Sequence, residues 1–354
     1  MSVLEVRDLT VEFGQRSGGR LRAVDNLSFA LREGQTLALV GESGSGKSTV
    51  VRALAQLVKR TSGEILLDGA PAGRRGQALR GYRHRVQLVF QDPFASLNPM
   101  HTVRHHLIRP LQLRRDRPRG EDLEQAVYEL LRSVNLTPPD EIATKHPHEL
   151  SGGQRQRVAI ARALATDPDV LLADEPVSML DVSIRLEILN LLDRLKRDRN
   201  LAMLYVTHDL ATARHFSSEI MVMYRGEIVE HGPSDEVILR PSHPYTQILA
   251  GSAPDPTVSR EALAEARRAR QAARASRTAE QREAAVGAGC RFRSRCPFAM
   301  DICATHPPDL PVASGHLARC WLLSDDVVRV GDGRDGRAAA AAGGAVTQPP
   351  QAGE

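Results

Sequence analysis

The sequence lacks an apolar run long enough to cross a membrane. A transmembrane helix needs about 20 predominantly apolar residues, whereas the best candidates here, residues 201–206 and 220–224, have the length of strands. The N-terminal segment carries acidic residues early and has no apolar signal core, so we expect no secretion signal. These absences favour a protein that is soluble in water and is not secreted.

The sequence also lacks a strong excess of either charge. It has 354 residues, with 47 Lys and Arg against 43 Asp and Glu, which gives a net charge of +4. This balance is too small to argue for a nucleic-acid partner. Apolar residues make up 42% and charged residues 25%, an ordinary mixture that can bury a sizeable core. The length predicts two domains, or one large domain with an appendage.

Short strands alternate with helical segments along most of the chain. Residues 2–13 and 23–31 alternate apolar and polar side chains, which predicts half-buried strands. Residues 36–40 form an apolar strand, followed by a glycine-rich turn and a helix over about 47–59. Further strands are predicted at 63–68, 86–90, 170–173, 201–206 and 220–223. This order predicts an α/β fold, with a mostly helical subdomain inserted at about 93–157.

A phosphate-binding loop lies between the strand at 36–40 and the helix that follows. Residues 41–48 fit the pattern G-x-x-x-x-G-K-[ST] in the required strand–loop–helix context. Backbone N–H groups and the helix N-terminus would bind phosphate oxygens, Lys47 would reach the β- and γ-phosphates, and the Ser48 hydroxyl would bind Mg²⁺. The predicted nucleotide contacts are Gly41, Ser43, Gly44, Ser45, Gly46, Lys47, Ser48 and Thr49.

Two carboxylates follow the apolar strand at 170–173. Asp174 would lie beside the phosphate loop and hold Mg²⁺, directly or through water. Glu175 would accept a proton from a water molecule in line with the γ-phosphate.

A second anion-binding surface is predicted at residues 151–154, where a serine and two glycines open a helix. Its members are Ser151, Gly152, Gly153 and Gln154. One chain therefore carries a single phosphate loop and a single such surface. This predicts two nucleotide sites, formed when two subunits pair head to tail and each closes over the ATP of the other.

This ordered set of motifs resembles the nucleotide-binding subunits of ABC transporters. In that family Gln91 matches the glutamine that senses Mg²⁺ and the γ-phosphate, and His208 matches the switch histidine. Residues 178–181 resemble the segment that contacts the opposing subunit through Asp181, although Met179 stands where the family usually has Ala. Phe13 occupies the position of the aromatic residue that stacks on adenine, although it also suits a strand core.

The resemblance implies an ABC ATPase core with an antiparallel β subdomain and the inserted helical subdomain. It also implies ATP hydrolysis that closes and reopens a dimer of identical or paralogous subunits, and thereby drives two transmembrane permease subunits. The chain would be peripheral, at the cytoplasmic face of the cell membrane. The alternative, a soluble ABC ATPase acting on nucleic acid or the ribosome, lacks the second cassette or the long coiled coil usual there.

Cysteine is absent from the first 289 residues, and the four cysteines are Cys290, Cys296, Cys303 and Cys320. An ATP-driven motor faces the cytosol, where disulfides are disfavoured, and clustered cysteines there more often bind metal. No close C-x₂₋₄-C pair typical of structural zinc occurs. Four thiolates suit a [4Fe–4S] cluster, with Zn²⁺ or unligated cysteines as alternatives. Arginines at 291, 293 and 295 are expected to favour thiolates.

The sequence around these cysteines is similar to the C-terminal extension of oligopeptide and dipeptide importers, in residues 243–246, 289–292 and 295–297. Some members of that subfamily carry a [4Fe–4S] cluster. The resemblance implies a peptide importer with an extracytoplasmic substrate-binding protein as a further partner. It leaves the cargo open among dipeptides, longer peptides, nickel complexes and related solutes. A redox-regulated ATPase is a further alternative.

Four segments are predicted from these patterns. We expect an ABC ATPase domain at 1–252, an Ala- and Arg-rich linker at 253–288, a cysteine-rich module at 289–323 and a disordered tail at 324–354.

Overall fold

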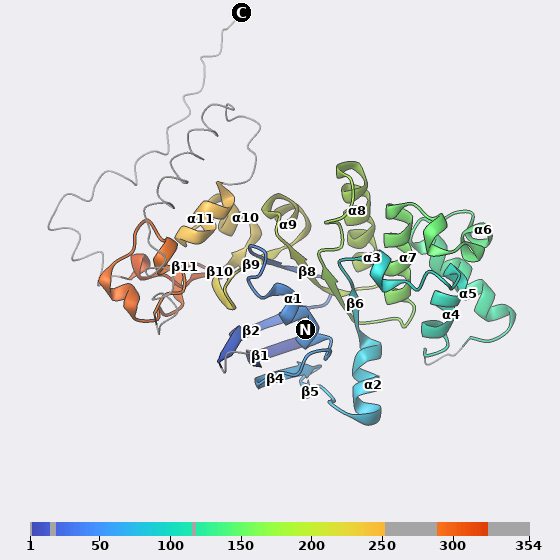
Figure 1. Ribbon diagram of the computed structural model, residues 1–354, viewed down its shortest axis with the longest axis horizontal. Coiled ribbons are helices and arrows are strands. Elements are labelled where there is room, and N and C mark those ends of the chain that lie inside the picture. The colour runs from blue at the N-terminus through green and yellow to red at the C-terminus, as the bar shows by residue number, and fades with distance from the viewer. Residues whose placement is uncertain (1, 15–18, 115–117, 252–288, 325–354) are drawn as a thin grey trace, which may run out of the picture.

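Two β-sheets form the framework of the protein (Figure 1). The computed structural model describes residues 2–14, 19–114, 118–251 and 289–324. The predicted linker at 253–288 and all but the first residue of the predicted tail at 324–354 lie outside these ranges. None of the helices within the described ranges has the length and hydropathy needed to cross a lipid bilayer.

The larger sheet has eight strands in the order β11-β12-β10-β9-β3-β8-β7-β6. Its strands are β3 (Thr36–Val40), β6 (Val86–Val89), β7 (Val170–Asp174), β8 (Ala202–Thr207), β9 (Glu219–Tyr224), β10 (Glu227–Pro233), β11 (Leu310–Ala313) and β12 (His316–Ala318). Strands β9, β3, β8, β7 and β6 are parallel neighbours. Parallel strands are buried on both faces, which explains why every residue of β3, β7 and β8 is buried.

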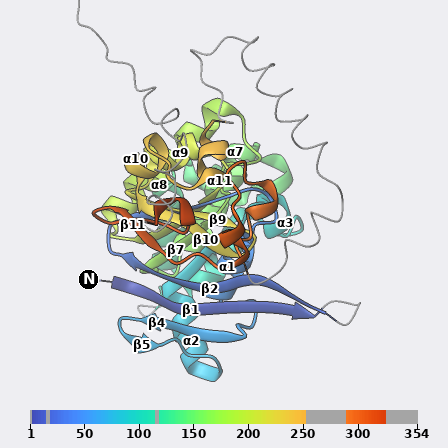
Figure 2. The ribbon, with the colours of Figure 1, turned by 90° about the vertical axis from the view of Figure 1, so that its left-hand side faces the viewer.

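The smaller sheet is antiparallel and lies as a separate layer beneath the larger one (Figure 2). It contains β1 (Ser2–Gly14), β2 (Arg20–Arg32), β4 (Ser62–Leu67) and β5 (Ala70–Pro71), in the order β2-β1-β4-β5. Helix α1 (Lys47–Leu54) packs its apolar side between the two sheets, because Val50 and Leu54 share one core cluster with residues of both. The β subdomain expected from the resemblance is thus present.

A group of helices lies between β6 and β7 in the sequence, at the end of the molecule opposite the cysteines (Figure 1). These are α3 (Pro93–Ser96), α4 (Val103–Leu111), α5 (Glu121–Ser133), α6 (Pro139–Thr144), the short 3₁₀ helix η1 (Pro147–Glu149) and α7 (Gly152–Leu164). Their apolar faces form one cluster that continues to the strands of the larger sheet. The predicted helical insertion is present.

The remaining helices flank the strands. They are α2 (Gly76–Arg85), α8 (Val182–Asp198), α9 (Leu210–Phe216), α10 (Ser234–Leu239) and α11 (Pro244–Ala250). The helix predicted over 47–59 ends at Leu54, because Gln56 adopts a left-handed conformation with φ of 55°. The N–H of Leu57 then bonds to the carbonyl of Arg52 at 2.8 Å, a closed turn that ends the helix. Helix α2 and strand β10 were absent from the sequence prediction.

The described residues 289–324, which contain the predicted cysteine module, pack against the larger sheet. They contain three 3₁₀ helices, η3 (Arg293–Arg295), η4 (Asp301–Ala304) and η5 (Trp321–Leu323), and the hairpin β11–β12. Strand β12 pairs with β10, with Glu230 opposite Ala318. The module therefore extends the sheet of the ATPase core by two strands.

Candidate functional site

The loop from Gly41 to Lys47 curls between β3 and α1. Gly46 has φ of 111°, and a Cβ on it would lie 2.3 Å from the carbonyl oxygen of Ala23. A larger residue is therefore excluded at this position. The Lys47 ammonium donates to the carbonyl oxygens of Gly41 at 2.7 Å and Glu42 at 3.0 Å, so its side chain lies along the inside of the loop. Burial lowers the pKa of Lys47, and the acidic groups nearby oppose that shift.

The end of β7 lies beside this loop, as predicted. The Ser48 hydroxyl donates to Asp174 Oδ1 at 3.2 Å. Asp174 is buried, and burial raises its pKa above the ordinary value, while the bond from Ser48 opposes the rise. A hydroxyl and a buried carboxylate in contact are the oxygen ligands that Mg²⁺ prefers.

Glu175 lies at the meeting point of three separate chain segments. Gln91 Nε2 donates to Glu175 Oε2 at 3.1 Å, and His208 Nδ1 lies 3.3 Å from the same oxygen. Glu175 has φ of 45°, an uncommon conformation for a residue with a side chain, and its N–H bonds to the carbonyl of Val206 in the next strand. Such strain is typical of functional positions.

A cavity of about 1460 Å³ contains these groups. Eleven of the predicted nucleotide and catalytic residues line it: Phe13, Ser43, Gly44, Ser45, Gly46, Lys47, Ser48, Thr49, Gln91, Glu175 and His208. Phe13 lies near the end of β1 and is 40% exposed, so it is part of the cavity wall and not of the core. The volume is ample for a nucleotide.

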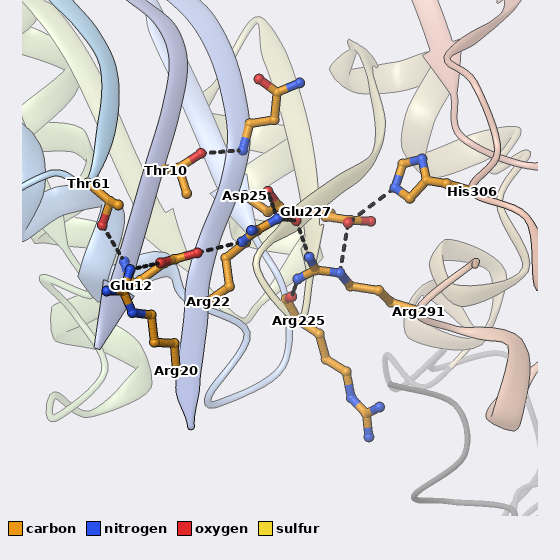
Figure 3. A network of polar contacts seen from close by, with 11 residues as sticks. Thr10, Glu12, Arg20, Arg22, Asp25, Thr61, Arg225, Glu227, Arg291 and His306 are labelled. Carbon is orange, nitrogen blue, oxygen red and sulfur yellow. Dashed lines mark hydrogen bonds and ion pairs between the residues drawn. The ribbon is translucent and has the colours of Figure 1, made fainter. Parts of the chain in front are cut away.

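The cavity is also lined by charged residues to which the sequence prediction gave no role in the nucleotide site. Arg291 of the cysteine module forms ion pairs with Asp25 of β2 and, at 2.7 Å, with Glu227 of β10. His306 contacts the same Glu227 oxygen at 3.1 Å. Figure 3 shows Arg291 reaching between the two acids, with His306 beyond Glu227. These charges come from three distant segments, and no local sequence pattern links them.

The residues at 151–154 lie away from this cavity in the same chain. Ser151 caps α7: its hydroxyl accepts from the Gln154 N–H at 3.2 Å, and Gln154 Oε1 accepts from the Ser151 N–H at 3.0 Å. A Cβ on Gly153 would lie 2.9 Å from Ile184 of α8. Asp181 is exposed at the start of α8. None of these residues lines the cavity that contains the phosphate loop, so they are not part of a nucleotide site within one chain.

Comparisons with known proteins agree with this geometry. Residues 24–178 match the family described as ABC transporter, and residues 229–303 match the one described as oligopeptide/dipeptide transporter, C-terminal region. A putative peptide import ATP-binding protein of Brucella ovis is 42% identical over 320 residues, covering 90% of this chain and 97% of that protein. The chain belongs to the ABC transporter ATP-binding subunits. It is therefore an ATPase of that family.

Other members of the ABC family are also similar. The oligopeptide transport ATP-binding protein OppF of Salmonella typhimurium is 38% identical over 329 residues, covering 90% of this chain and 95% of that protein. The dimeric structure of an ATP-binding cassette bound to ADP and Pi shares 31% identity, with a TM-score of 0.59, over 65% of this chain and 98% of that one.

The four cysteines of this ABC subunit line one small pocket between η3, η4 and η5. All are free thiols; Cys296, Cys303 and Cys320 are buried, and Cys290 is half-buried. Burial raises the pKa of Cys320 to about 12. Within the described residues, no group of three or more His, Cys, Asp or Glu side chains is arranged to hold a metal ion.

Two of the three arginines beside the cysteines form ion pairs with the ATPase core. Arg291 and Arg295 were expected to favour thiolates, but their guanidinium groups pair with acidic residues of the ATPase core. Burial raises the pKa of Cys290 above its ordinary value. The positions of arginines in the sequence could not predict these ion pairs, because they do not show which way a side chain points.

Proposed function

We propose that this protein is the ATP-binding and ATP-hydrolysing subunit that powers a multi-subunit ABC importer of peptides or related solutes. The observation that carries the proposal is the contact of Gln91 and His208 with one oxygen of Glu175, beside the phosphate loop. The relatives named as peptide import proteins and the matched C-terminal region support peptides as the cargo class.

The proposed hydrolysis uses the residues of the cavity in defined roles. Lys47 and the N–H groups of residues 41–49 hold the β- and γ-phosphates. Ser48 and Asp174, together with Gln91, would hold Mg²⁺, which neutralises charge that develops on the phosphate oxygens. Glu175 accepts the proton of the attacking water. His208 contacts the γ-phosphate and Phe13 stacks on adenine.

We propose that the site is completed by a second ATP-binding subunit, either a copy of this chain or a paralogue. Ser151, Gly152, Gly153 and Gln154 would bind the γ-phosphate held by the partner, and Asp181 would contact the partner's phosphate loop. The exposed apolar side chains around Asp181 support this interface. They are Met179, Val182 and Leu186, which are 56%, 73% and 53% exposed. Closure and reopening of the dimer would follow ATP binding and hydrolysis.

The remaining partners follow from the importer assignment. A groove of about 1110 Å³ runs between α1, β6 and α4, and both Gln91 and Asp174 border it. A permease helix seated there would sense the nucleotide site directly, which supports docking of two transmembrane permease subunits on the helical insertion. The chain would then lie at the cytoplasmic face of the cell membrane, and an extracytoplasmic binding protein would deliver the cargo. We expect no nucleic acid.

We propose that residues 1–252 form the ABC ATPase domain, that 253–288 link it to the cysteine module at 289–323, and that 324–354 form a tail. We further propose that Cys290, Cys296, Cys303 and Cys320 bind a [4Fe–4S] cluster. The shared pocket supports the cluster, because each cysteine then binds a different iron and the sulfurs need not converge on one point. A single Zn²⁺ requires that convergence.

The cluster proposal is tested by purifying the protein without oxygen. We expect a brown sample with a broad absorption band near 400 nm, and iron and sulfide at about four each per chain. A colourless sample that contains zinc, or no metal, would refute the cluster. Loss of ATPase activity on oxidation of the cluster would support the alternative of redox regulation.

The ATPase assignment is tested with Glu175→Gln, which keeps the shape of the side chain but removes the proton acceptor. We expect turnover to fall by about 100-fold or more, while the affinity for ATP stays within about threefold. Glu236→Gln, a substitution of a partly exposed residue on α10, is the matched control. Full hydrolysis by Glu175→Gln would exclude the general-base role.

A further inference from the structure

The phosphate loop carries a negative side chain of its own, at Glu42. Two features hold this residue. Its N–H donates to the Tyr245 hydroxyl at 2.9 Å, and its carboxylate accepts two bonds from Arg295, at 2.8 Å from Nη1 and 2.9 Å from Nη2. Glu42 also lies close enough to Lys47 to influence its pKa. A negative charge beside Lys47 opposes the binding of phosphate, unless a cation neutralises it.

Arg295 comes from the cysteine module, 253 residues further along the chain. Its guanidinium lies 5.7 Å from the ring centre of Tyr224 and 5.8 Å from that of Phe292. These aromatic rings restrict the guanidinium to the orientation that presents two N–H groups to Glu42. Arg295 immediately precedes Cys296, so the position of its backbone depends on the fold of the cysteine pocket.

We propose that Arg295 is a positioning residue for ATP binding, through which the cysteine module controls the charge of the phosphate loop. Arg295 neutralises Glu42, and ATP then meets Lys47 and the loop N–H groups without a competing carboxylate. The inference rests on the proposed binding of ATP by residues 41–49.

The test compares the affinity for Mg-ATP of the full-length chain and its variants, measured by calorimetry at low salt. Arg295→Gln removes the cation that neutralises Glu42. The Glu42 carboxylate then lies within a Debye length of the bound phosphates and repels them. We expect the Kd to rise about five- to twentyfold. The defect should shrink to about twofold in 1 M salt, where the Debye length is about 3 Å.

The decisive variant is the double substitution E42Q/R295Q. It removes the repelling charge as well as its partner, so we expect a Kd within about twofold of the unaltered protein. If Arg295 only fastened the module to the core, Glu42→Gln would not restore affinity. A failure of this rescue would therefore overturn the proposal, as would wild-type affinity in R295Q.

Two further variants keep the result interpretable. Arg293→Gln removes a positive charge from the same 3₁₀ helix, at a residue that forms no ion pair with the part of the chain that the structure describes, and we expect its Kd to be unchanged. If R295Q does not fold, R295K keeps the charge and should bind ATP within about threefold. Absence of ATP binding by the unaltered protein would instead refute the assigned function of the loop.

Discussion

Substitution of Glu230 by glutamine should separate the cysteine module from the ATPase core. Glu230 lies on β10 with a fully buried side chain. Its Oε1 accepts from the N–H of Ser242 and from His316 Nε2, both at 2.8 Å, and its Oε2 accepts from the N–H of His243 at 3.0 Å. One carboxylate therefore joins the core sheet, the segment before α11 and strand β12.

The cost of the substitution follows from these three donors. A glutamine side chain has one acceptor oxygen and one donor NH₂ group. In either orientation the NH₂ group faces a backbone N–H, of Ser242 or of His243. With the NH₂ group toward His243, one bond to a charged acceptor is lost. With it toward Ser242, two are lost, because His316 shares that oxygen. In both cases a buried donor is left unsatisfied and the remaining bonds lose their charge assistance. We expect E230Q to lower the free energy of unfolding by about 3–4 kcal/mol.

Urea unfolding measures this loss with a built-in local probe. Trp321 is the single tryptophan of the chain and lies in the module, where its Nε1 donates to the Thr305 carbonyl at 3.0 Å. In E230Q we expect its fluorescence to change at lower urea than the far-ultraviolet circular dichroism. The control E236Q removes only an ion pair between partly exposed Glu236 and exposed Arg240, so it should change stability by less than about 0.5 kcal/mol. A loss below about 1 kcal/mol in E230Q would refute the reasoning.

Three other substitutions test single positions. Burial lowers the pKa of His243 to about 4, from 6.5, so the unfolded chain binds more protons between these pH values and stability should fall by about 3 kcal/mol as the pH drops from 6.5 to 4. Asn at this position can still cap α11, so H243N should remove this slope; an unchanged slope would contradict the assignment. Gly46→Ala should prevent ATP binding and cost about 3 kcal/mol or more, because its Cβ meets the Ala23 carbonyl. Gly69→Ala, with φ of 75° and open space around it, should cost only about 1–2 kcal/mol.

The elements that were predicted correctly have strong local signals. Strand β3 was placed at its observed bounds, 36–40, because a threonine and four apolar residues precede a glycine-rich turn. Strand β10 was missed because it lies at the junction with the module and carries two acidic residues that are nevertheless buried. Glu227 forms an ion pair with Arg291, and Glu230 accepts bonds from His316 and from the N–H groups of Ser242 and His243. Helix α2 was missed because a single residue of it, Tyr82, is buried.

The sequence by itself determined the family of this protein and the candidate residues of its nucleotide site. These residues belong to short sequence patterns: the phosphate loop and the pair Asp174 and Glu175. Each pattern is local in the chain, and the order of the strands brings the two together. Only the tertiary structure decided which residues of the cysteine module contact the phosphate loop. The pairing of Arg295 with Glu42 spans 253 residues, and it exists because β12 adds to the sheet of the ATPase core. Ion pairs at such separations depend on packing, which is why no pattern in the sequence contained them.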